Sequence, residues 1–320
     1  MLCMILVSCT GQKTGKENDN NDKIAIEVGE IKFPPQDVLQ LKSYYLSSSV
    51  HVDSIDYLIG YNYRLHSLDC MNLKSKSVTQ IVLPGDGPDA IVRLSGIYAQ
   101  SLDSVWISDE SERAFLIDSV GTIKRMIDLK KYLEDQEQLL INTNYAMFTS
   151  HLFYNASRHS LMFLVKHTPS NTFIVKEVFI DEVGKMATYQ LSSSKVVPDM
   201  SKGYAYINFP NVNFVGENIV YNYPVESSIY MLDIRTNERK YILADSHYTS
   251  NIIEKCTTSG DYATLEKHWL ENSHFYDIMY LPKYKIYARL HADKVDFDEK
   301  KGMEKLINCL LYTSDAADDL

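Results

Sequence analysis

The stretch ENIVYNYPVESSIYMLDIRTNERKYILAD, residues Glu217–Asp245, predicts three short β-strands joined by two tight turns. Asn218–Tyr223 is a run of β-branched and aromatic residues, Ser228–Ile234 alternates, and Arg239–Leu243 is a third run. The segments between them carry Pro, Ser, Thr, Asn and Glu, which favour turns. We interpret this stretch as the unit from which the rest of the chain is built.

The same order of strands and turns recurs in three other places. Residues 56–84 and 103–131 repeat it closely, and residues 159–191 form a longer copy. The four copies start at 56, 103, 159 and 217, so they are 47, 56 and 58 residues apart. An aliphatic residue followed by Asp stands at matching places in three copies, and we interpret Asp69, Asp118 and Asp233 as turn caps.

This spacing is typical of a β-propeller, whose blades are four-stranded sheets of about 40–50 residues. Such a sheet has two apolar faces and buries both only against neighbouring blades, so the unit must recur. A β-sandwich or two smaller β domains is the alternative, because hairpins also recur loosely in those folds. The shared Leu/Ile-Asp position favours true repeats. We therefore predict an all-β fold, a β-propeller.

Composition narrows the possible partners. The 320 residues are 45% hydrophobic and 23% charged, which is an ordinary globular balance. The formal net charge is −10 and basic runs are lacking, which argues against a nucleic-acid partner. Five cysteines are scattered without metal-ligand spacing. Cys70 and Cys256 are predicted to be buried free thiols, with a disulfide between them as the alternative.

The N-terminus predicts a membrane anchor. Residues 1–8 are apolar, and Leu6-Val7-Ser8-Cys9 resembles the lipobox of bacterial lipoproteins, in which the cysteine is lipidated after cleavage. Residues 10–23 hold no aliphatic or aromatic residue and read as a flexible tether. The leader is short and lacks a basic start, so we expect a gene clipped at this end or a start codon upstream. Thr10 in place of Asp implies the outer membrane, facing either the periplasm or the outside.

The C-terminal segment Cys309–Leu320, CLLYTSDAADDL, resembles the translation of a transposon-type sequencing adapter. We therefore predict that 309–320 is an artefact, that the propeller domain spans 24–308, and that the natural chain is truncated near Asn308. Within that domain, His274–Ala292 predicts a hairpin that opens a fifth unit. Lys130–Leu140 has helical spacing and predicts a helix, and Pro84–Ala90 predicts a turn rather than a phosphate loop.

No constellation of residues assigns chemistry to the chain. The sequence has no HxH, HExxH or G-x-S-x-G motif, and we assign no catalytic, cofactor-binding or metal-binding residue. Two weak metal candidates are treated as ordinary surface or strand residues: His268, His274 and His291 with Asp277, and Asp293, Asp296, Asp298 and Glu299. Arg64 and Arg289 are candidates for a propeller channel, with plain surface positions as the alternative.

A family resemblance rests on three features: the lipobox, the segment DSVWISDESERAFLIDSVGTIKRMIDL, and the hairpin YDIMYLPKYKIYARL. Together they resemble a group of uncharacterised Bacteroidetes lipoproteins that are predicted to form TolB-like six-bladed β-propellers. The resemblance covers about residues 23–308, and the hairpin matches the family pattern only in part. It implies six blades but brings no catalytic residue and no ligand.

Two functions follow as expectations. The first is an outer-membrane-anchored lipoprotein that acts as a non-catalytic binding propeller for an envelope protein or a glycan, without a cofactor. The second is a lactonase-like or lyase-like propeller enzyme with a metal or carboxylate in its central channel, which rests on fold analogy alone.

Overall fold

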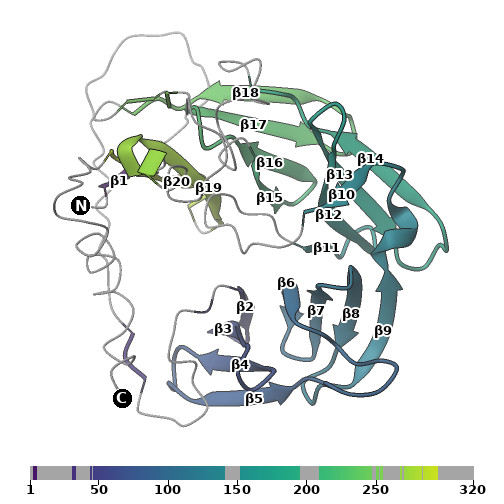
Figure 1. Cartoon of the computed structure of the whole chain (residues 1–320). Helices are drawn as coiled ribbons and strands as arrows, with labels where there is room; N and C mark the ends of the chain where they lie inside the picture. The colour runs from purple at the N-terminus through teal and green to yellow at the C-terminus, as the bar shows by residue number, and fades with distance from the viewer. Residues whose placement is uncertain are drawn as a thin grey trace. The chain divides into compact units, whose positions relative to one another are not determined.

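A computed structural model describes residues 3–5, 31–33, 44, 46–140, 152–194, 209–246, 250–251, 253–254, 267–268, 270–282 and 284–294 (Figure 1). In these ranges the fold is all-β and contains four blades of the propeller type. The chain divides into two compact units: Phe33–Ser193 with Asp296–Leu320, and Met1–Lys32 with Ser194–Val295. The described part holds no helix with the length and apolar character needed to cross a bilayer. Cys9, the predicted tether and residues 309–320 lie outside the described residues.

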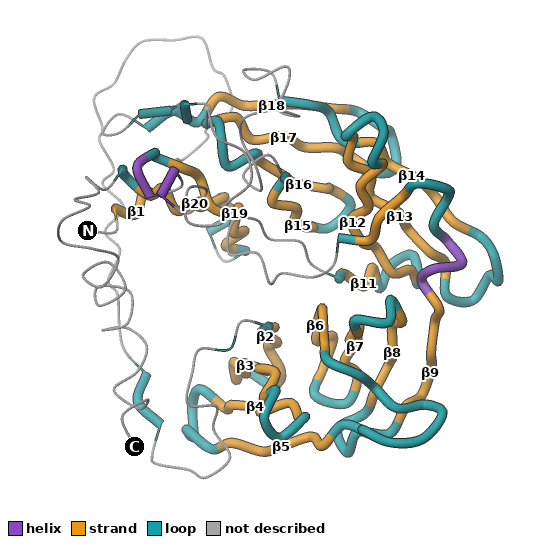
Figure 2. The backbone as a smooth tube through the Cα atoms, in the orientation of Figure 1, coloured by secondary structure: helices purple, strands orange, loops and turns teal. Residues whose placement is uncertain are grey.

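Three antiparallel sheets make up the unit Phe33–Ser193 (Figure 2). The first is β2 (Ser47–Val52), β3 (Ile55–Asn62), β4 (Ser67–Asn72) and β5 (Val78–Val82). The second is β6 (Leu94–Ser101), β7 (Ser104–Asp109), β8 (Arg113–Ile117) and β9 (Ile123–Asp128). The third is β10 (Glu137–Leu139), β11 (Phe153–Asn155), β12 (Ser160–His167), β13 (Thr172–Phe179) and β14 (Met186–Gln190), with β10 and β11 both paired to β12.

The other unit contains one complete blade and a hairpin. The blade is β15 (Asn211–Val215), β16 (Asn218–Asn222), β17 (Ser228–Asp233) and β18 (Arg239–Leu243). The hairpin is β19 (His274–Leu281) and β20 (Ile286–Ala292), and the short strand β1 (Cys3–Ile5) pairs antiparallel with β20. The predicted hairpin over His274–Ala292 is therefore confirmed. The strand β1 belongs to the segment that cleavage before Cys9 would remove.

The sequence copies begin one strand late in each blade. Their starts at 56, 103, 159 and 217 fall at β3, β7, β12 and β16, which are the second strands of their sheets. The first strand lies against the first strand of the next blade within each unit: β2 beside β6, β6 beside β11, and β15 beside β19. This contact between first strands is the packing of propeller blades.

The core of the unit Phe33–Ser193 lies between its blades. One apolar cluster joins the first two sheets, from Ile59 and Leu68 to Ile107 and Phe115, and a second joins the next two around Trp106. A blade covered on both faces buries consecutive strand residues. The neighbours Lys176 and Glu177 on β13 show this, since both have 0% exposure. Two-sided burial explains why the strands read as nearly continuous apolar runs.

The predicted helix over Lys130–Leu140 is wrong. Only a single 3₁₀ turn, η1 (Leu129–Tyr132), forms, and the Asp128 side chain accepts a hydrogen bond from the Lys130 amide at its start. A turn follows and leads into β10, which pairs with β12. Tertiary pairing of this segment with the long strand β12 overrides its local helical spacing.

Two of the three predicted turn caps are confirmed. The Asp118 carboxylate accepts hydrogen bonds from the amides of Val120 and Thr122, and the Asp233 carboxylate accepts from those of Arg235 and Thr236. Asp69 does not cap a turn, because it lies within β4, buried, and accepts from side chains. Asn72 stands three residues later and caps the equivalent turn through its side-chain oxygen. The alignment of the first copy was therefore shifted by three residues.

Candidate functional site

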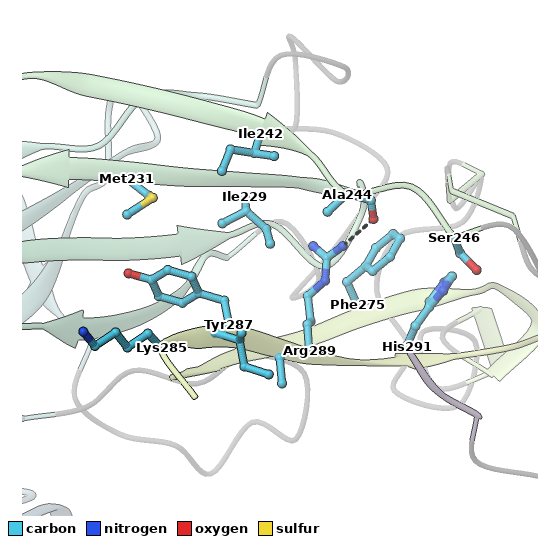
Figure 3. Close-up of a pocket in the computed structure, with 12 residues that line it drawn as sticks. Ile229, Met231, Ile242, Ala244, Ser246, Phe275, Lys285, Tyr287, Arg289 and His291 are labelled. Carbon is cyan, nitrogen blue, oxygen red and sulfur yellow. Dashed lines mark hydrogen bonds between the residues drawn. The ribbon is translucent and has the colours of Figure 1, made fainter. Parts of the chain in front are cut away.

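A cavity of about 250 Å³ lies in the unit Ser194–Val295, between β17 and β18 on one side and the β19–β20 hairpin on the other (Figure 3). Aliphatic and aromatic side chains form most of its wall. Its described lining residues are Ile229, Met231, Ile242, Ala244, Ser246, Phe275, Lys285, Ile286, Tyr287, Ala288, Arg289 and His291. None of these is Asp or Glu.

The alternation of side chains along the strands explains which residues form this wall. Ile229 and Ile242 are direct partners in the β17–β18 pairing, so they share one face of that sheet, and Met231 continues the face two residues on. On β20, Tyr287, Arg289 and His291 are also two residues apart and therefore share a face. Two facing sheet surfaces with period-2 side chains thus enclose the cavity.

Arg289 supplies its central polar group. The side chain is 8% exposed, and Nη2 donates to the backbone carbonyls of Ser227 at 2.9 Å and Ala244 at 3.1 Å. Nη1 is buried and makes no hydrogen bond within the described residues. Burial lowers the pKa of Arg289 to about 9, while the negative charges of Glu226 and Asp245 act in the opposite direction. The guanidinium therefore stays protonated at neutral pH and keeps an unused donor.

Phe275 lies between Arg289 and His291, as Figure 3 shows. The guanidinium carbon of Arg289 is 4.0 Å from the centre of the Phe275 ring, in cation–π geometry. The His291 ring stacks on Phe275 with centroids 4.0 Å apart and planes 13° from parallel. Burial, and secondarily the charge of Arg289, lowers the pKa of His291 to about 4. His291 is therefore neutral at pH 7.

The predicted metal candidates do not come together. His274 pairs with Ala292 and His291 with Phe275, so the two histidines point to opposite faces of the hairpin. His268 contacts the backbone carbonyl of Glu254 through its ring. Across the described ranges, no three His, Cys, Asp or Glu side chains are placed to hold a metal ion. Asp293 is exposed, and Asp296, Asp298 and Glu299 lie outside the described residues.

The two arginines that were candidates for a propeller channel differ in their exposure. Arg64 lies exposed in the turn between β3 and β4, which agrees with a surface position. Arg289 is buried and faces the cavity. The alternating apolar residues of these strands were visible in the sequence, but nothing there indicated that the hairpin and the β17–β18 pair would face each other across a cavity.

The buried carboxylates of Glu177 and Asp109 are engaged in blade structure. The Glu177 carboxylate accepts from Arg158, Ser160 and Tyr189. The Asp109 carboxylate accepts from the Arg113 side chain at 2.6 Å. Arg289 differs from these groups because one of its donors remains unpaired. A cationic donor set in an apolar wall can hold an apolar group that carries a carboxylate or carbonyl oxygen.

Comparison with solved structures identifies the fold. No protein-family model and no curated protein matches the chain. The structure resembles a member of the DUF4221 family from Bacteroides vulgatus, with a TM-score of 0.64 at 13% identity, over 83% of this chain and 75% of that one.

A looser likeness links it to oligogalacturonate lyase from Vibrio parahaemolyticus, with a TM-score of 0.40 at 10% identity, over 80% of this chain and 67% of that one. The WD40 domain of SCAP from fission yeast gives 0.34 at 9% identity, over 61% and 51%. These last two likenesses carry no argument. At 13% identity, the first supports a shared fold and nothing about activity.

Proposed function

We propose that this protein is a non-catalytic binding module of the cell envelope, held at the outer membrane by acylation of Cys9. Its recognition site is the cavity between β17–β18 and the β19–β20 hairpin. The observation that carries the proposal is the buried guanidinium of Arg289, whose Nη1 has no partner among the described residues and borders an apolar cavity. An envelope protein fits this site better than a glycan, because the wall is mainly aliphatic.

The chemistry of the lining residues favours binding over catalysis. A general acid or base works best with a pKa near the working pH. In the described wall, Arg289 remains charged and His291 remains neutral at pH 7. No carboxylate lines the described wall. The described residues of this site provide no observation that supports the alternative, a lactonase-like or lyase-like enzyme.

The anchor rests on the sequence Leu6-Val7-Ser8-Cys9 and the polar tether behind it. Two or three acyl chains on Cys9 would hold the protein firmly at the membrane, since stable anchoring needs more than one chain. The family resemblance adds the finer expectation of a TolB-like ring of six blades from a Bacteroidetes lipoprotein.

Site-specific photocrosslinking in intact cells tests this function. A photoreactive phenylalanine analogue at Tyr287, which lines the cavity, is expected to capture a partner, and Arg289→Met is expected to reduce the yield. The matched control places the same analogue at Tyr241, which is 53% exposed on β18 of the same unit. Cys9→Ala is expected to move the protein out of the membrane fraction. Equal or absent capture at the two positions would remove the case for the cavity.

A further inference from the structure

The cavity lies against sheet faces whose backbone groups are already engaged in strand pairing. On one side, β17 pairs with both β16 and β18. On the other side, β20 pairs with β19 and, over residues 289–291, with β1. The backbone N–H and C=O groups of these pairs serve the ladders between strands. A ligand in the cavity therefore meets side chains.

The charged side chains of the described wall are cationic. Arg289 and Lys285 line the cavity, and no Asp or Glu is among the described lining residues. Arg289 is 8% exposed, and its Nη1 has no partner among the described residues. A carboxylate oxygen is the strongest acceptor for a guanidinium donor. Most of the remaining wall is aliphatic or aromatic and suits an apolar group.

Two carboxylates that do not line the cavity also act on Arg289. The buried Glu226 carboxylate accepts hydrogen bonds from the hydroxyls of Ser228 at 3.1 Å and Tyr230 at 2.8 Å. Asp245 is exposed and accepts from a serine hydroxyl. The hydrogen bonds of Arg289 in the described structure go instead to backbone carbonyls. Both negative charges favour the protonated guanidinium and oppose a further anion, so a carboxylate ligand needs direct contact with Nη1.

The residue at the end of a polypeptide chain meets these requirements. It carries an apolar side chain and a carboxylate together. An internal segment would bring more peptide groups into apolar surroundings, and each buried N–H or C=O without a partner costs free energy. The volume of about 250 Å³ is below the roughly 300–1,000 Å³ of small-molecule sites. It suits one residue with a large side chain better than a longer segment.

We infer that the cavity captures the C-terminal residue of a partner polypeptide, with an apolar side chain against Ile229 and Ile242 and the carboxylate on Arg289. The inference rests on the proposed binding function and names the part of the partner that is recognised. Capture of a C-terminal carboxylate is a recurring mode of peptide recognition. Lys285 adds a second positive charge to the same wall.

Two fluorescent peptides that differ only at their ends test the inference on the full chain. Both have the sequence Gly-Ser-Gly-Ser-Gly-Leu, one with a free C-terminal carboxylate and one with a C-terminal amide. In fluorescence anisotropy, the acid is expected to bind saturably and at least about tenfold more tightly than the amide, the effect of one charge-assisted hydrogen bond. Arg289→Met is expected to remove that difference. Ile242→Trp, which fills the cavity and leaves Arg289 in place, is expected to abolish binding of both peptides.

Glu226→Gln separates charge from shape. This change removes the buried negative charge near Arg289 and keeps the size of the side chain. The acid peptide is therefore expected to bind more tightly than it binds the natural chain, while the amide peptide binds as before. A purely structural role of Arg289 would not produce this split between the two peptides.

The outcomes separate this inference from the proposed function. Equal binding of acid and amide, or no saturable binding of either, overturns the inference. Tighter binding of octanoate than of the acid peptide, in a competition titration, also overturns it, because the ligand would then be a free carboxylic acid. The photocrosslink at Tyr287 tests the proposed function separately. Capture of an internal segment of a partner keeps the binding function and overturns the C-terminal inference, whereas capture of a partner's last residues supports both.

Discussion

The buried ion pair between Lys176 and Glu137 in the third blade is predicted to stabilise the fold. The Lys176 ammonium is 2.5 Å from the Glu137 carboxylate, and the two side chains are 0% and 3% exposed. Lys176 also donates to the Tyr132 carbonyl at 2.8 Å, and Glu137 accepts from the Glu134 amide at 2.6 Å. Replacement of Lys176 by Met leaves a buried carboxylate with one neutral donor. We expect a loss of about 3–5 kcal/mol in the free energy of unfolding.

A double-mutant cycle separates the pair from its surroundings. Glu137→Gln keeps the shape and leaves Lys176 with the Tyr132 carbonyl, so a smaller loss of about 1–3 kcal/mol is expected. The double variant Lys176→Met/Glu137→Gln removes both charges and is expected to be more stable than Lys176→Met alone. Urea unfolding of the four proteins gives the free energies. If Lys176→Met costs less than about 1 kcal/mol, or the double variant is the least stable of the four, this account of the pair is wrong.

Three further predictions follow from particular residues. Since the pKa of His291 is about 4 in the folded protein and 6.5 is its ordinary value, the unfolded chain binds more protons between these two values. Stability should therefore fall from pH 6.5 to 4, by at most about 3 kcal/mol, and His291→Phe should flatten that slope in urea titrations at each pH.

Gly121 has φ +85° and an added Cβ would lie 2.3 Å from the Val82 carbonyl oxygen. Gly121→Ala should thus destabilise by about 2 kcal/mol or more, against about 1 for Gly184→Ala, which has φ +79° and open space. Burial and the Asp69 charge raise the pKa of the Cys70 thiol to about 11. Maleimide at pH 7.5 should therefore label Cys70 only in denaturant, as mass spectrometry would show, and rapid labelling of the folded protein would contradict the burial.

The sequence predicted the blades because their rule is local. Short apolar strands separated by tight turns recur wherever a sheet must bury two faces, so the β3–β5 and β16–β18 segments could be predicted from the sequence. The first strand of each blade was missed because β2 (SSSVHV) and β6 (LSGIYAQS) have weak alternation and gain their place from the neighbouring blade. The helix over Lys130–Leu140 failed for the same reason. The end of this segment forms the strand β10 because it pairs with β12, which lies about 30 residues later in the chain.

The cavity could not be predicted from the sequence because it forms between segments that lie far apart along the chain. Arg289 meets the carbonyls of Ser227 and Ala244, which lie 62 and 45 residues away. A hairpin sequence such as YDIMYLPKYKIYARL shows that an arginine sits on a strand, not that its guanidinium will be covered. The wrong cap at Asp69 has a different cause. Both Asp and Asn can cap turns, and Asp69 was chosen because the other copies carry Asp at the matching place, although Asn72 is the residue that caps this turn.

The energetic position of Arg289 is the strongest reason to treat the cavity as a site. Lys176 and Glu177 show that this fold pairs the charges it buries. Arg289 is buried to a similar degree, yet Nη1 remains without a partner among the described residues. Burying a charge with an unused donor costs free energy that a leucine or methionine at the same position would not. A partner carboxylate or carbonyl would recover that cost on binding. The arrangement therefore stabilises a complex at the expense of the free protein, as expected of a recognition site.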